Sequence, residues 1–72
     1  MADIALQSEV TGTVWKIEVQ EGDAVSADQS LLIMESMKME IPVVAPRAGT
    51  VRRLLVAEGE AVAEGQDVVV LA

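Results

Sequence analysis

The chain contains two copies of one pattern, and this internal repeat restricts the fold more than any other feature. Residues 12–25 align with residues 49–62 at an offset of 37 positions, and the same offset matches residues 29–34 with residues 66–71. With 72 residues, the chain is long enough for one small domain. Each copy is too short to bury its own apolar side, and two copies are too few for a repeat array. We therefore expect one domain, residues 1–72, whose two halves are related by a pseudo-twofold axis.

Each copy is predicted to form a strand, a turn and a second strand. The apolar positions that both copies share are Val14 and Val51, Ile17 and Leu54, and Val19 and Val56. Regular alternation would separate them by two residues, so the longer step after Val14 predicts a bulge or a strong bend. Trp15 aligns with Arg52, which indicates that this position faces solvent or lies at a sheet edge. No helical period stands out, and the predicted fold class is all-β.

Turn signals separate the predicted strands. Residues 21–23 and 58–60 are matching tight turns in which glycine supplies a positive φ, and residues 45–49 form a third turn. Pro42 has no amide hydrogen to donate, so either its strand is expected at a sheet edge or its nitrogen faces away from the partner strand. The predicted core consists of repeat-matched apolar residues, namely Val19, Val25, Ile33, Val56, Val62 and Val70.

The composition argues against several functional classes. The chain has no cysteine and no histidine, which removes disulfides, thiolate metal sites and histidine bases. Its net charge of −7 argues against binding to nucleic acid or to anionic membranes. No apolar run approaches the ~20 residues of a membrane-spanning helix. The first residues show no secretory signal, and we expect a cytoplasmic location.

Residues 35–40, Glu-Ser-Met-Lys-Met-Glu, lie between two apolar segments, residues 31–34 and 41–44. Two strands this close in sequence are expected to form a hairpin with Met37 and Lys38 at its tip. Tight two-residue turns favour Asn-Gly or Asp-Gly, so Met-Lys conflicts with the geometry that the hairpin requires. Conflicts between local preference and fold tend to occur at functional sites.

Lys38 could be an ordinary surface lysine beside two incidental methionines. The combination favours another interpretation, because Met37 and Met39 frame this lysine at the midpoint of the repeat. Methionine suits adaptable recognition surfaces. A lysine at a hairpin tip also stands clear of the fold, where a modifying enzyme can enclose its amine. The flanking Glu35 and Glu40 either contribute to recognition or simply border an exposed hairpin.

The sequence resembles the biotinyl/lipoyl carrier domain family over nearly its whole length. The similarity covers Gly-x-Val-x-x-Ile-x-Val-x-x-Gly-Asp-x-Val at residues 12–25, Glu-Ser-Met-Lys-Met at residues 35–39, Ala-Pro at residues 45–46, and a second Gly-x-Val at residues 49–51. The resemblance implies a flattened β-sandwich or barrel of two four-stranded sheets, a barrel-sandwich hybrid. It also implies that biotin is attached covalently to Lys38. The recognition motif around that lysine would be Glu35, Ser36, Met37, Met39 and Glu40.

Details of the motif favour biotin over lipoate. Lipoyl domains usually carry Asp before the lysine and Ala after it, whereas this chain has Met37 and Met39. Biotin carriers usually have Ala at the position of Ser36, which is a small difference. The two halves match in length, so there is no room for the protruding insertion of some bacterial acetyl-CoA carboxylase carriers.

By this resemblance the chain is a biotin carboxyl carrier and not an enzyme. A biotin protein ligase would load Lys38, a biotin carboxylase would carboxylate the biotin, and a carboxyltransferase would pass the carboxylate to an acyl-CoA or a keto acid. The isolated chain is expected to be monomeric, with no metal site and no catalytic residue. Two alternatives stay open, a lipoyl carrier and a non-acylated interaction module. The resemblance also leaves open the acceptor, and whether the chain is free-standing or part of a longer carboxylase.

The repeat also predicts where the chain ends lie. Adding the offset to Met37 and Lys38 gives positions just past Ala72. The symmetry therefore relates the hairpin to the chain ends, and a first strand around residues 4–6 should pair near the last strand. Met1 and Ala72 are expected close together, at the end of the molecule opposite Lys38.

Overall fold

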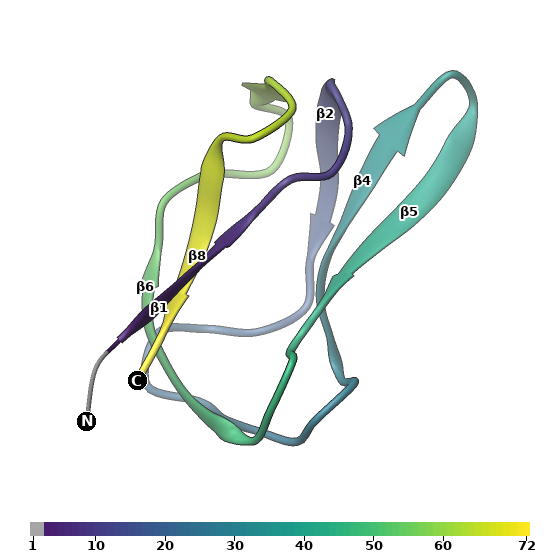
Figure 1. Cartoon of the computed structure of the whole chain (residues 1–72). Coiled ribbons are helices and arrows are strands. Elements are labelled where there is room, and N and C mark those ends of the chain that lie inside the picture. The colour runs from purple at the N-terminus through teal and green to yellow at the C-terminus, as the bar shows by residue number, and fades with distance from the viewer. Residues whose placement is uncertain (1–2) are drawn as a thin grey trace.

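The computed structural model describes residues 3–72, which form two antiparallel sheets of four strands each (Figure 1). The strands are β1 (Ile4–Gln7), β2 (Gly12–Ile17), β3 (Ala24–Val25), β4 (Ser30–Ser36), β5 (Met39–Val44), β6 (Gly49–Leu54), β7 (Ala61–Val62) and β8 (Asp67–Leu71). One sheet has the order β1-β8-β6-β3 and the other β5-β4-β2-β7. The predicted all-β fold of two four-stranded sheets is confirmed. Within residues 3–72 no helix is long and apolar enough to cross a membrane.

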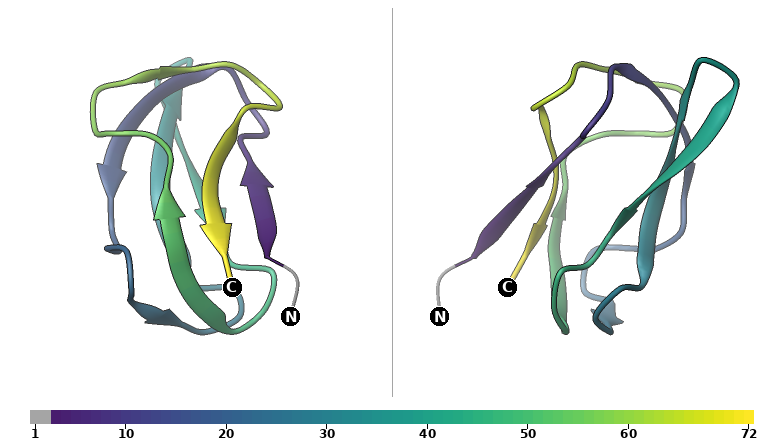
Figure 2. Two further views of the ribbon diagram at one scale, coloured as in Figure 1. Left: turned by 90° about the vertical axis from the view of Figure 1, so that its left-hand side faces the viewer. Right: turned by 45° about the vertical axis from the view of Figure 1, so that its right-hand side comes forward.

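The pseudo-twofold relation holds at the level of individual residue pairs. In one sheet Ile4 pairs with Leu71, and in the other Ile41 pairs with Met34, both shifted by the repeat offset. Each sheet takes its two central strands from one half and its two edge strands from the other: β4 and β2 lie between β5 and β7, while β8 and β6 lie between β1 and β3. The halves are therefore interlocked, because neither half completes a sheet without the other (Figure 2).

The predicted irregularity after Val14 is a shift in strand register. The pairing of β2 with β4 shifts between Val14 and Lys16, and the pairing of β6 with β8 shifts between Val51 and Arg53. Trp15 lies at the first of these bulges with 50% of its surface exposed, as the alignment with a charged residue predicted.

Acidic side chains of the tight turns secure the bulged strands across the two halves. Glu58 Oε2 accepts a hydrogen bond from the amide of Ile17 at 2.8 Å, and Glu21 Oε2 accepts one from the amide of Leu54 at 3.0 Å. These two contacts are related by the repeat offset. Because each bulge ends next to a carboxylate of the other half, the two halves are fixed relative to one another.

Four of the six residues predicted for the core are buried there, namely Val19, Val25, Val56 and Val62. The prediction is wrong for Ile33 and Val70, which are only partly buried. Ile33 lies between Leu32 and Met34, which point into the core, so strand alternation turns Ile33 to the outer face of the sheet. Val70 has the same place in β8. The remaining core residues are Val14, Leu31, Leu32, Met34, Ala45, Val51, Val68, Val69 and Leu71.

The chain ends follow the predicted arrangement as far as they are described. β1 pairs with β8, with Ile4 opposite Leu71, and β5, which carries Pro42, is an edge strand as predicted. Ala72 lies toward the end of the molecule away from the β4–β5 hairpin tip (Figures 1 and 2). The prediction for Met1 falls outside the described residues.

Candidate functional site

The candidate site is the tip of the β4–β5 hairpin, which projects at the upper right in Figure 1. Ser36 pairs with Met39, so Met37 and Lys38 are the two central residues of the turn, as predicted. Their φ angles are 51° and 65°. Positive φ at both central positions is typical of a type I′ turn, which normally contains Asn and Gly. An L side chain in this conformation costs on the order of 1 kcal/mol, so the turn accepts strain that a different sequence would avoid.

The side chains around the turn are open to solvent. Met37 is 91% exposed and Met39 is 62% exposed, and Lys38 is exposed between them. Among residues 3–72, the Lys38 side chain takes part in no ion pair and no hydrogen bond. An amide bond to a carboxylic acid needs one accessible primary amine. The geometry of Lys38 therefore fits a covalently attached acyl cofactor such as biotin.

The base of the hairpin is held in place by its neighbour β2. Ser36 Oγ donates a hydrogen bond to the carbonyl oxygen of Thr11 at 2.8 Å. At Gly12 the backbones approach so closely that a Cβ atom would overlap the carbonyl oxygen of Glu35, which explains the glycine. The serine hydroxyl at the position of the usual alanine thus fixes the hairpin to the start of β2.

Thr11 supports the hairpin but was not recognised from the sequence. Its carbonyl oxygen accepts the Ser36 bond, and its Oγ1 accepts a hydrogen bond from the amide of Glu64 at 3.0 Å. Thr11 therefore links the hairpin to the loop between β7 and β8. The only signal in the sequence was its place directly before the first glycine of the repeat.

Glu35 and Glu40 face each other across the hairpin. The two residues form a register pair, and both are exposed. Like charges directly opposite on neighbouring strands are destabilising, by a few tenths of a kcal/mol up to about 1 kcal/mol. Among residues 3–72 the one ion pair joins Arg52 and Asp3, so neither glutamate has a cationic partner. The pair makes the surface below the Lys38 turn acidic, which suits contact with a basic surface.

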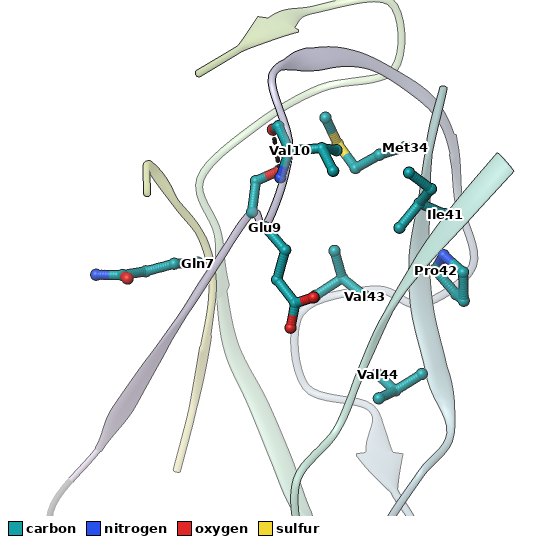
Figure 3. Close-up of a pocket in the computed structure, with 9 residues that line it drawn as sticks. Gln7, Glu9, Val10, Met34, Ile41, Pro42, Val43 and Val44 are labelled. Atoms are coloured by element: carbon teal, nitrogen blue, oxygen red, sulfur yellow. Dashed lines mark hydrogen bonds between the residues drawn. The ribbon is translucent and has the colours of Figure 1, made fainter. Parts of the chain in front are cut away.

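A small pocket lies beside the hairpin, between the segment that follows β1 and the edge strand β5. Its cavity volume is about 70 Å³, and it is lined by Met34, residues 7–10 and residues 41–44 (Figure 3). Sites for cofactor-sized ligands usually measure roughly 300–1,000 Å³. The pocket is too small to enclose such a ligand. Within residues 3–72 no cluster of three or more carboxylates could hold a metal ion.

Comparison with known proteins adds to this geometry. The biotin/lipoyl family model, described as biotin-requiring enzyme, matches residues 2–71 of this chain. The biotin/lipoyl attachment protein of Bacillus subtilis (strain 168) is 48% identical over 40 residues, which are 56% of this chain and 55% of that protein. A biotinylated protein TB7.3 homolog of Mycolicibacterium smegmatis is 42% identical over 40 residues, or 56% of each chain. The alignments thus span little more than half of these relatives.

A solved structure extends the similarity over the whole chain. The crystal structure of the Kluyveromyces lactis urea carboxylase contains a region that superimposes with a TM-score of 0.94 at 36% sequence identity. The match covers 100% of this chain and 6% of that enzyme. The same architecture therefore occurs as a small part of a large carboxylase.

Proposed function

The chain belongs to the biotin/lipoyl attachment family, and we propose that it is a biotin carboxyl carrier that is biotinylated on Lys38. The exposed Lys38 turn carries this proposal, because it presents an unpaired amine between two exposed methionines. Biotin is favoured over lipoate because Met37 and Met39 flank the lysine and because a relative is described as a biotinylated protein. The predicted cytoplasmic location is part of the proposal and rests on the sequence alone.

The role of the chain in attachment is to present one nucleophile. The Lys38 amine loses a proton and forms an amide bond with the carboxyl carbon of biotinyl-AMP, while the bond from that carbon to the phosphate oxygen breaks and AMP leaves. Within the described part of the chain no base pairs with this amine, so the biotin protein ligase must supply the group that takes the proton. The hairpin contributes exposure, and the Ser36–Thr11 hydrogen bond holds its base in place.

The role of the chain after attachment is to carry the cofactor between active sites. Biotin supplies a group that accepts carboxylate in one active site and releases it in another. The chain raises the local concentration of this group at a biotin carboxylase and a carboxyltransferase, because a tether converts diffusion into an intramolecular encounter. In this role the chain itself performs no catalytic step. The similarity to part of a urea carboxylase supports action within a multi-component carboxylase.

Mass spectrometry of the intact chain and its peptides tests the attachment site. We expect co-expression with a biotin protein ligase to add one biotinyl group, located on Lys38. The Lys38→Arg variant should gain none. Lys16→Arg is the matched control, because Lys16 is the other lysine of the chain, lies within β2 and should leave modification unchanged. Label on Lys16, or label that survives Lys38→Arg, would contradict the proposal.

The lipoyl alternative is separated by the identity of the attached group. Avidin blotting of chain from cells that contain both ligases should be positive, and blotting with an antibody against lipoyl-lysine should be negative. A lipoyl group on Lys38 would retain the attachment site but replace biotin as cofactor. An unmodified Lys38 would instead favour the interaction module.

A further inference from the structure

The outer face of the sheet that contains the Lys38 hairpin carries four apolar side chains, here termed the Trp15 face: Trp15, Ile33, Pro42 and Val44. Ile33 pairs with Pro42 on β5 and with Lys16 on β2, and Trp15 lies at the bulge directly before Lys16. Pro42, Ile33 and the bulge thus form a row across β5, β4 and β2, and Val44 lies two residues along β5 from Pro42. Trp15 is 50% exposed and Val44 is 42% exposed. Ile33 is not among the residues that pack against the core. The Trp15 face is therefore a mainly apolar surface, with Lys16 beside Ile33, that the core does not use.

The second half of the chain provides an internal control for this face. The repeat offset relates Trp15 to Arg52, Ile33 to Val70, Pro42 to Ala5 and Val44 to Gln7. The backbone pairings are the same, since Ala5 pairs with Val70 as Pro42 pairs with Ile33. The corresponding face thus has a charged, a polar and a small residue at three of four places, and Arg52 there binds Asp3 at 2.9 Å. The fold does not require an apolar surface at these positions, so the Trp15 face has another role.

The Trp15 face is continuous with the proposed attachment site. The β4–β5 hairpin carries the Lys38 turn at its tip and Ile33, Pro42 and Val44 further along, and the acidic Glu35–Glu40 pair lies between them. At about 3.3 Å per residue, Pro42 lies roughly 13 Å along β5 from Lys38. A protein surface that closes around the Lys38 turn would extend over this distance. It would meet first the acidic pair and then the apolar row.

We propose that the Trp15 face is the docking surface for the biotin protein ligase, which would contact it through an apolar patch with lysine or arginine at its rim. This inference rests on the proposed function. Before attachment, the amine reaches only as far as the Lys38 side chain, so the ligase must bring its active site close to β4 and β5. Enzymes that act after attachment reach a group held further out by the length of the biotin arm. The ligase is therefore the partner with the greatest need for a surface on this sheet, and a basic rim complements Glu35, Glu40 and the net charge of −7.

Fluorine NMR tests the contact directly, because Trp15 is the only tryptophan of the chain. The wild-type chain labelled with 5-fluorotryptophan should give one signal. We expect that signal to shift or broaden, with saturation at one ligase per chain, when a purified, unlabelled ligase that biotinylates the chain is added. An unchanged signal at saturating ligase would overturn the proposal. A signal that moves with carrier concentration alone would indicate self-association, and one that responds only to a carboxylase would indicate a different partner; both outcomes would also overturn it.

Kinetics provide the second test. Trp15→Arg installs the residue that the second half carries, and Trp15→Ser removes the ring without adding charge. Both variants should lower kcat/KM for biotinylation at least about tenfold, mainly through a higher KM, because an aromatic contact residue of the interface is lost. A tenfold change corresponds to about 1.4 kcal/mol. Trp15→Phe should stay within about threefold, because the aromatic contact is retained.

Leu55→Glu is the matched control, because Leu55 is an apolar residue of similar exposure, 42%, that follows β6 of the other sheet. It should leave kcat/KM unchanged, and urea unfolding should show that each variant is folded. Wild-type kinetics in Trp15→Arg and Trp15→Ser would overturn the docking surface while leaving the attachment site intact. A wild-type chain that no ligase biotinylates would overturn the proposed function and, with it, this inference.

Discussion

At the scale of single residues, the Lys38 turn stands out because its conformation does not suit its sequence. Met37 and Lys38 have positive φ, and their side chains gain almost no packing in return, since Met37 is nearly fully exposed. Asp28, at φ 67°, is the one other non-glycine residue among those described with this geometry, and its repeat partner is Gly65. The second half thus has glycine where the first half has Asp28. Under the proposed function, the need for Met37 and Lys38 at the turn overrides the local preference.

Replacing Met37 with Asn should stabilise the fold. Asn tolerates positive φ better than Met does, so Met37→Asn is expected to raise the free energy of unfolding by about 0.5–1 kcal/mol. Urea unfolding with an unchanged slope measures this. Met39→Asn is the control, because Met39 is also exposed but lies in β5 without a positive φ, and it should bring no gain. Equal effects of the two substitutions would show that turn strain is not the cause.

At the scale of the element, β4 combines two roles on its two faces. Leu32 and Met34 fill the core, while Ile33 belongs to the outer surface. Leu32→Ala should therefore cost roughly 2–5 kcal/mol of unfolding free energy, because it leaves a cavity in a fully buried site. Ile33→Ala should cost about 1 kcal/mol or less, because it removes only partly buried area. Urea unfolding of the two variants compares neighbouring positions in one strand, and a larger loss for Ile33→Ala would mean that the strand faces the other way.

The same strand shows what the sequence could and could not predict. The bulge after Val14 and the exposed position of Trp15 were predicted correctly. Both copies of the repeat occupy equivalent places in the fold, so the residues at aligned positions show which features the fold requires. The repeat could not show whether the Ile33 side chain points into the core or outward. Its repeat partner Val70 is also apolar, although both residues lie on outer faces of their sheets. The support from Thr11 was also missed, because a backbone carbonyl oxygen leaves no mark on the sequence. The hairpin tip was predicted from its unusual residues, but its attachment to β2 needed coordinates.

At the scale of the whole molecule, the proposed attachment site and the C-terminus lie toward opposite ends of a body 35 Å long (Figure 1). Spin labels on cysteines at Ala5, Lys38 and Ala72 test this in a chain that has no natural cysteine. The distance between labels at Ala5 and Ala72 should be short, because β1 pairs with β8. The distance from Lys38 to Ala72 should be a large part of the long dimension. A short distance from Lys38 to Ala72 would contradict the symmetry that relates the turn to the chain ends.

The interlocked sheets also bear on how such a chain could have arisen. Each sheet needs central strands from one half and edge strands from the other, so two identical half-length chains could form the same body as a homodimer with a true twofold axis. Such a dimer would have chain ends at both poles. In the present chain Met37 and Lys38 connect β4 to β5 at one pole, while Ala72 lies toward the other pole. The proposed modified lysine thus lies in the connection between the two copies of the repeat, where a duplicated gene would have been joined. In the dimer this connection would not exist, because the two chains would end there.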